Sequence, residues 1–186
     1  MGKVILGLTI SLDGFAEDLH RNVQSLYPDK DALQETETMK KSISSTGAVV
    51  MSRKEFSMAG DPDSIADNYE YQVPIFVFTD KEPEKHPKES DKVKFTFVTG
   101  GISSAVHQAK EAAGDKDVTI IGSALTARHC LNESIADELH LDVLPVFLKT
   151  GFRPFDGIDT EAVKLERIDA EELPAGRTRI RLRFIK

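Results

Sequence analysis

The chain has no tryptophan, a single cysteine and no long run of apolar residues among its 186 positions. Because it is alone, Cys130 cannot form an intramolecular disulfide, which fits a reducing compartment and a buried structural thiol. No apolar stretch approaches the roughly 20 residues that a membrane-spanning helix needs. We therefore expect a cytoplasmic protein that does not engage a membrane.

Positive charge is also scarce. Lys and Arg number 24 against 31 Asp and Glu, which gives a formal net charge of −7. Without a basic run or alternating basic and aromatic residues, nucleic acid is a poor candidate partner. The five histidines show no metal-ligand spacing, so no metal site is expected. The 40% hydrophobic content is enough for a core, and the length fits one domain over residues 1–186.

Short apolar runs alternate with segments of helical periodicity along most of the chain. The pattern predicts strands at 3–10, 48–51, 74–79, 95–98, 118–121 and 138–144, and helices over 29–45, 102–113 and 125–131. Residues 16–28 are predicted to form a polar loop, Gly47 to cap the first helix, and Gly100-Gly101 to precede the second. Residues 161–169 and 177–185 are predicted to form a final antiparallel pair. Arg179, Arg181 and Arg183 share one face of it, which could attract anions, although a solvated sheet face is the alternative that we favour. This order predicts an α/β fold: three αβα layers, a mostly parallel central sheet and a C-terminal antiparallel hairpin.

Three of these strands end in short polar or small-residue segments, at 51–54, 78–80 and 121–124. Ligands of parallel α/β sheets gather at the carboxyl ends of strands, so the three turns could hold a dinucleotide. Arg53 would then pair with a phosphate, and the Gly122–Ala124 amides would bind a pyrophosphate. The alternative is that these are ordinary tight turns, since no intact GxGxxG motif is present.

Two acidic positions are candidates for substrate chemistry. Asp13 lies in a Ser-Leu-Asp-Gly turn, where it could face a pocket, although Asp-Gly is also among the commonest turn pairs. Glu35 shares one face of the helix predicted over 29–45 with Asp31 and Thr38. A buried acid on that face could donate a proton, whereas a solvated acidic face is the alternative that we favour.

Taken together, several segments resemble a known family more specifically than any one does alone. They are Ser11-Leu12-Asp13-Gly14, residues 48–56 (AVVMSRKEF), residues 74–79 (PIFVFT) and residues 120–155, which contain ADEL at 136–139 and PVFL at 145–148. In this order they resemble the reductase domain at the C-terminus of bifunctional riboflavin-biosynthesis deaminase/reductases, a family with the dihydrofolate reductase fold. The resemblance spans nearly the whole chain.

The resemblance implies an NADPH-dependent reductase, with NADH also possible, that is usually a homodimer and acts on a small pyrimidine- or pteridine-like molecule. It places the substrate and nicotinamide near Asp13, and Asp13 and Glu35 are our catalytic candidates. It places the cofactor against three turns, formed by Ser52, Arg53 and Lys54, by Thr79 and Asp80, and by Gly122, Ser123, Ala124 and Leu125. Two alternatives stay open: a non-catalytic, ligand-binding or dimeric member of the same fold, and a true dihydrofolate reductase.

Overall fold

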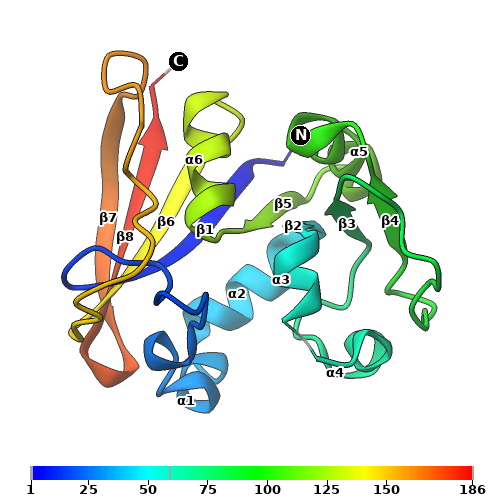
Figure 1. Ribbon diagram of the computed structural model, residues 1–186, viewed down its shortest axis with the longest axis horizontal. Coiled ribbons are helices and arrows are strands. Elements are labelled where there is room, and N and C mark those ends of the chain that lie inside the picture. Colours follow the sequence, from blue (N-terminus) through cyan, green and yellow to red (C-terminus); the bar gives the residue numbers. More distant parts are fainter. Residues whose placement is uncertain (1, 59, 186) are drawn as a thin grey trace. The chain divides into compact units, whose positions relative to one another are not determined.

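The computed structural model describes residues 2–58 and 60–185. The chain forms two compact units, which are interleaved in sequence (Figure 1). The first consists of Met1–Val4 and Ser42–Ile121, and the second of Ile5–Lys41 and Gly122–Lys186. Each unit combines parallel strands with helices, as an α/β chain requires.

The first unit contains four parallel strands in the order β4-β3-β2-β5. Their bounds are β2 (Thr46–Ser52), β3 (Ile75–Phe78), β4 (Phe95–Val98) and β5 (Asp117–Ile121). The helices of this unit are α3 (Arg53–Ser57), η2 (Pro62–Ser64), α4 (Ile65–Asn68) and α5 (Gly101–Ala113). Parallel pairing brings the carboxyl ends of β2, β3 and β4 to one edge of this part of the sheet.

Helices cover both faces of β2. Four consecutive residues, Ala48 to Met51, are all buried, although successive side chains of a strand point to opposite faces. The helices α5 and α3 both contact β2 and β3. α5 presents a stripe of buried residues at helical spacing, namely Ile102, Ala105, Val106, Ala109 and Ala113.

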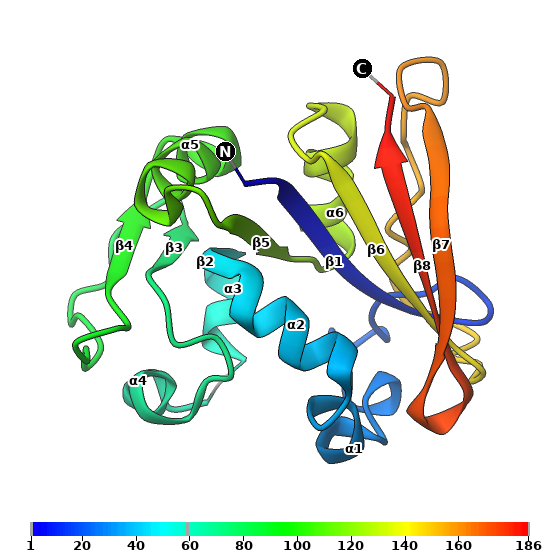
Figure 2. The same cartoon turned by 180° about the vertical axis from the view of Figure 1, so that it is seen from behind.

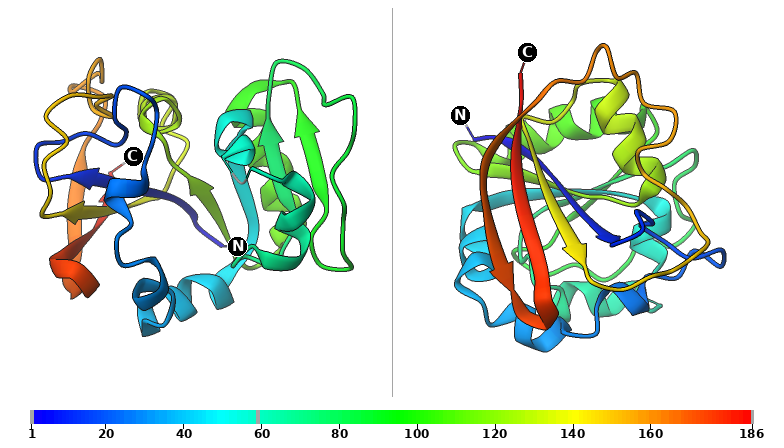
Figure 3. Two further views of the ribbon diagram at one scale, coloured as in Figure 1. Left: turned by 60° about the horizontal axis from the view of Figure 1, so that its bottom comes forward. Right: turned by 90° about the vertical axis from the view of Figure 1, so that its left-hand side faces the viewer.

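The second unit is built around β1 (Val4–Ser11), β6 (Glu138–Leu144), β8 (Arg177–Phe184) and β7 (Leu165–Leu173), in that order. β1 and β6 are parallel, whereas β8 is antiparallel to both of its neighbours. Figure 2 shows β6, β8 and β7 side by side, and Figure 3 shows the hairpin of β7 and β8, joined by η3 (Pro174–Gly176). Its helices are η1 (Gln24–Leu26), α1 (Lys30–Gln34), most of α2 (Glu37–Ser45) and α6 (Ala124–Asn132).

The mostly parallel strands and the C-terminal hairpin confirm the predicted fold class, but three details of the prediction are wrong. The helix predicted over 29–45 is divided into α1 and α2, because the Thr36 hydroxyl bonds to Leu33 O and accepts from Met39 N, which starts a new helix. Gly47 lies inside β2 and does not cap α2; a Cβ there would lie 2.9 Å from Ala113 O. The first hairpin strand begins at Leu165, four positions later than the predicted start at 161.

The prediction that the arginines of β8 lie on a solvated face is wrong, because most of them pair with acidic side chains. Arg177 is fully buried, and Arg179 donates two hydrogen bonds to Asp142, of 2.6 and 2.8 Å. Arg181 pairs with Asp169 and Glu171 of β7, and only Arg183 is more than half exposed. The alternation of residues in β8 was read correctly, but the acidic partners on β6 and β7 could not be inferred from it.

Cys130 is buried and forms no disulfide, as expected. Among the helices of the described residues, none is long and apolar enough to cross a membrane.

Candidate functional site

The turn after β2 is organised by a capping box. Ser52 Oγ accepts hydrogen bonds from the backbone N–H groups of Lys54 and Glu55, and the Glu55 carboxylate accepts the Ser52 N–H at 2.7 Å. These contacts satisfy donors that would otherwise be free at the start of α3. The Ser52 side chain is therefore a local cap, and it fixes the direction in which the next residue, Arg53, leaves the strand.

Arg53 is an exposed cation held over aromatic rings. Its guanidinium carbon lies 5.4 Å from the ring centroid of Phe56 and 5.7 Å from that of Phe97. Cation–π contacts of this kind orient a guanidinium while leaving its N–H donors free. Within residues 2–58 and 60–185, no carboxylate lies in ion-pair distance of Arg53. Arg53 is thus an oriented cation that is available to an anionic ligand.

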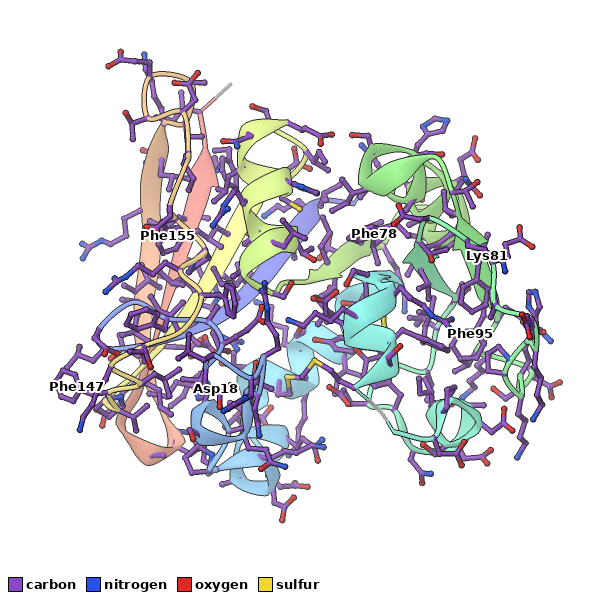
Figure 4. The ribbon with its side chains drawn as sticks, in the orientation of Figure 1. Asp18, Phe78, Lys81, Phe95, Phe147 and Phe155 are labelled. Atoms are coloured by element: carbon purple, nitrogen blue, oxygen red, sulfur yellow. The ribbon has the colours of Figure 1, made fainter. Side chains whose placement is uncertain are left out.

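The turn after β3 lies next to the Arg53 turn, because Ser52 and Phe78 are paired in register. Thr79 N donates to Val98 O at 3.0 Å, and the Thr79 hydroxyl donates to Lys81 O at 2.9 Å. Phe78 and Lys81, on either side of this turn, are labelled in Figure 4. Asp80 is exposed and forms no ion pair with Arg53. Thr79 therefore shapes the turn, whereas Asp80 adds a negative charge to the same edge.

The turn after β4, at Gly100 and Gly101, was not included among the predicted site residues. Both glycines are exposed, Gly100 gives α5 no side-chain cap, and a Cβ on Gly101 would meet nothing within 4 Å. The start of α5 therefore presents open backbone at the same edge as Arg53. The Gly-Gly pair was the available sequence signal, but it was read only as a helix start.

The Gly122–Leu125 turn of the second unit is closed by contacts within that unit. Gly122 N donates to Gly7 O at 2.9 Å, and a Cβ on Gly122 would lie 2.6 Å from that oxygen. Ser123 caps α6 by accepting the Thr126 N–H, and Ala124 N donates to Glu17 Oε1 at 3.0 Å. Close strand packing thus accounts for the glycine, and the first amide of α6 already has an anionic partner from this chain.

Sequence reasoning missed Glu17. It lies in the segment after β1 that was predicted to be a polar loop, yet it is fully buried. Its second carboxylate oxygen pairs with Arg21 at 3.4 Å, and the Arg21 guanidinium carbon lies 3.1 Å from the Phe152 ring centroid. No local pattern could have identified this role, because the partner of Glu17 on α6 is 107 positions away.

Asp13 joins two loops of the second unit. Its carboxylate accepts hydrogen bonds from the Leu148 N–H at 3.1 Å, the Lys149 N–H at 2.8 Å and the Ser11 hydroxyl at 2.6 Å. Desolvation raises the pKa of Asp13, but these hydrogen bonds together outweigh it and hold the pKa below its usual value. Asp13 is consequently a carboxylate at neutral pH, which favours a positioning role over proton donation.

Glu35 ends α1 on the surface of the second unit. Its side chain is 82% exposed and lies 3.6 Å from Lys40. Because the helix breaks after Glu35, the common face with Asp31 and Thr38 is not formed as predicted. The two predicted catalytic carboxylates thus differ in environment: Asp13 is held by three hydrogen-bond donors, whereas Glu35 is exposed to solvent beside Lys40.

Comparison with known proteins identifies relatives of this arrangement. The family model described as RibD C-terminal domain matches residues 2–177. No curated protein matches the chain significantly. A protein from Shewanella sp. PV-4 named for riboflavin biosynthesis superposes with a TM-score of 0.76 at 20% identity, covering 99% of both chains.

Two further solved structures share the fold. The diaminohydroxyphosphoribosylaminopyrimidine deaminase/5-amino-6-(5-phosphoribosylamino)uracil reductase of Thermotoga maritima gives a TM-score of 0.67 at 14% identity, covering 99% of this chain and 57% of that one. A dihydrofolate reductase of Enterococcus faecalis, solved with NADP(H), gives 0.59 at 10% identity, covering 100% and 98%. These likenesses confirm the dihydrofolate reductase-like fold. Since the family model covers nearly every residue, the chain belongs to the RibD C-terminal domain family.

Proposed function

We propose that the protein is a nicotinamide-dependent reductase of the riboflavin-pathway type, with NADPH as its cofactor. The observation that carries the proposal is Arg53, an exposed and oriented cation that has no carboxylate partner among the described residues. It lies beside the Thr79 turn at the carboxyl ends of β2 and β3, the edge where α/β sheets bind ligands. Bidentate N–H donors of this kind match a phosphate group.

The residues of the first unit fit a phosphorylated cofactor. Arg53 supplies charge, and the open backbone at Gly101 allows close approach of a phosphate. Ser52, Lys54, Thr79 and Asp80 would line the same edge. When bound, a nicotinamide cofactor supplies the hydride, and the protein contributes binding and orientation.

The Gly122–Leu125 turn fits a phosphate poorly, because Ala124 N already donates to a carboxylate. We therefore propose that Gly122, Ser123, Ala124 and Leu125 of the second unit make no phosphate contact. Asp13 would position the loop on the substrate side. Glu35 is exposed on the surface, and its role as a catalytic acid stays our proposal from the resemblance alone.

The substrate we propose is a small pyrimidine- or pteridine-like molecule with a reducible C=N or carbonyl group. The Thermotoga maritima enzyme is named for an aminouracil substrate, which supports this class. We also propose a cytoplasmic homodimer, in keeping with the single cysteine and with the family resemblance.

Titration of the full chain with NADPH, followed by quenching of nicotinamide fluorescence, tests the cofactor assignment. We expect binding in the micromolar range and, at about 100 times the dissociation constant, a stabilisation of about 2.7 kcal/mol. Absence of binding of NADPH and NADH at millimolar concentration would contradict the proposal. NADPH oxidation with dihydrofolate as substrate distinguishes a dihydrofolate reductase.

A second candidate function is a non-catalytic member of the fold. Two observations favour it: the exposed carboxylate of Asp80 beside Arg53, and the carboxylate already bound at the start of α6. Both carboxylates would repel the negatively charged phosphate groups of a dinucleotide. This candidate predicts a folded chain that binds neither nicotinamide cofactor.

A further inference from the structure

Glu17 is a buried titratable group that the proposed reaction does not use. Its carboxylate bridges two partners, the Ala124 N–H at 3.0 Å and the Arg21 guanidinium at 3.4 Å. The side chain of Glu17 is 1% exposed, whereas that of Arg21 is 43% exposed. A carboxylate is rarely buried to this extent unless its charge is compensated, and here the helix amide and Arg21 provide that compensation.

The position of this carboxylate has an electrostatic consequence. The start of a helix carries partial positive charge and N–H groups without intrahelical acceptors, which is the environment that a bound phosphate oxygen would use. Glu17 Oε1 accepts the first of these N–H groups, and the Ser123 hydroxyl accepts that of Thr126. An incoming phosphate would therefore meet a like charge and find the leading amide occupied.

The backbone holds the carboxylate in this position. Phe152 N donates to Glu17 O, and Ala16 N donates to Phe152 O, both at 2.9 Å. The two segments are in close contact at Gly151, since a Cβ there would lie 1.9 Å from Glu17 O. The backbone from which the Glu17 side chain reaches α6 is therefore fixed.

We propose that Glu17 is a specificity-determining residue that excludes phosphate groups from the Gly122–Leu125 turn. The inference rests on the proposed cofactor and deepens it, because it assigns the anionic groups of the dinucleotide to other parts of the protein. This role of Glu17 also explains how the Gly122–Leu125 turn can begin a regular helix and yet not bind an anion.

The test uses inorganic pyrophosphate as the probe and the ¹⁵N-labelled full chain. Glu17→Gln removes the charge while keeping the size, and Glu17→Ala also opens the space. Glu172→Gln is the matched control, because it removes one negative charge at an exposed position of β7 in the same unit. Thermal melts establish that each variant is folded.

In the wild type and in Glu172→Gln, we expect no saturable shift of the Ala124 amide resonance up to millimolar pyrophosphate. In Glu17→Gln or Glu17→Ala, the same resonance should shift saturably, with affinity at least about tenfold higher. A saturable shift at Ala124 in the wild type would overturn the inference, as would its absence in both folded variants. If neither variant folds, Glu17 is required for the fold itself, which would contradict a role in specificity.

A parallel NADPH titration separates this inference from the proposed function. A pyrophosphate response in Glu17→Gln, with no NADPH binding by any variant, would contradict the cofactor assignment while supporting the exclusion. Conversely, NADPH binding together with a wild-type Ala124 response to pyrophosphate would support the cofactor and overturn the role of Glu17.

Discussion

Arg177 and Asp29 form a buried ion pair although they are 148 positions apart in the chain, with Nη2–Oδ1 and Nε–Oδ2 distances of 2.6 and 3.2 Å. Arg177 also donates to Leu26 O at 3.0 Å, and its Nη1 lies 3.6 Å from Asp142. β8, the second strand of the hairpin, thereby holds the segment that leads into α1. The segment that contains Asp29 follows the loop of Asp13, which the family resemblance places near the substrate.

Replacing Arg177 with Met should destabilise the protein strongly. The change keeps most of the side-chain volume but leaves the Asp29 carboxylate buried without its partner, so we expect the free energy of unfolding to fall by about 3–5 kcal/mol. Urea denaturation measures this change in the free energy of unfolding. Arg183→Met is the control: Arg183 is 57% exposed and 3.8 Å from Glu166, so the loss should stay below about 1 kcal/mol. Equal effects of the two substitutions would contradict this account.

Asp13→Asn should reduce stability in a pH-dependent way. Because the folded-state pKa of Asp13 is lowered, the wild-type carboxylate contributes stability above its unfolded value of 3.8, and this contribution is lost as the pH falls toward the folded value. The difference in unfolding free energy between wild type and Asp13→Asn should therefore be largest near neutral pH and shrink below about pH 4. Chemical denaturation at several pH values measures this. A difference that does not change with pH would argue against the three-donor site.

His140 should titrate below the ordinary histidine range. Burial lowers the pKa of His140, the hydrogen bond and charge of Glu138 oppose this only in part, and Arg179 and Arg181 lower it further. Neutral His140 thus contributes stability above its unfolded pKa of 6.5, and that contribution is lost as the pH falls. NMR titration of the imidazole C–H resonance gives the pKa directly. Glu138→Gln should lower it again, and a rise would contradict the assignment.

Gly122→Ala should destabilise the second unit regardless of any ligand. The added Cβ would lie 2.6 Å from Gly7 O and 3.1 Å from Leu6 Cδ1, both in β1. Overpacking of this kind typically costs about 1–3 kcal/mol. A thermal or urea melt without cofactor tests it. Unchanged stability combined with lost NADPH binding would instead assign the glycine to the cofactor.

The elements of the fold were predictable because they depend on local pattern. Runs such as Val118–Ile121 are apolar and β-branched, and the stripe on α5 repeats at helical spacing. The site was less predictable because its contacts are distant in sequence. The partner of Arg177 is Asp29, and that of Ala124 is Glu17, so neither the buried arginine nor the occupied helix start has a local signature. Arg53 is exposed and oriented, and its pairing with a phosphate stays a prediction.

The binding of NADPH and NADH to the full chain and to Arg53→Gln tests the central claim most directly. Lys92→Gln is the control, since Lys92 is also an exposed cation of the first unit. We predict that Arg53→Gln weakens NADPH binding by about tenfold or more and NADH binding much less, because only NADPH carries the additional phosphate. Lys92→Gln should leave both affinities unchanged. Failure of the wild type to bind NADPH, or equal affinities in wild type and Arg53→Gln, would contradict the account.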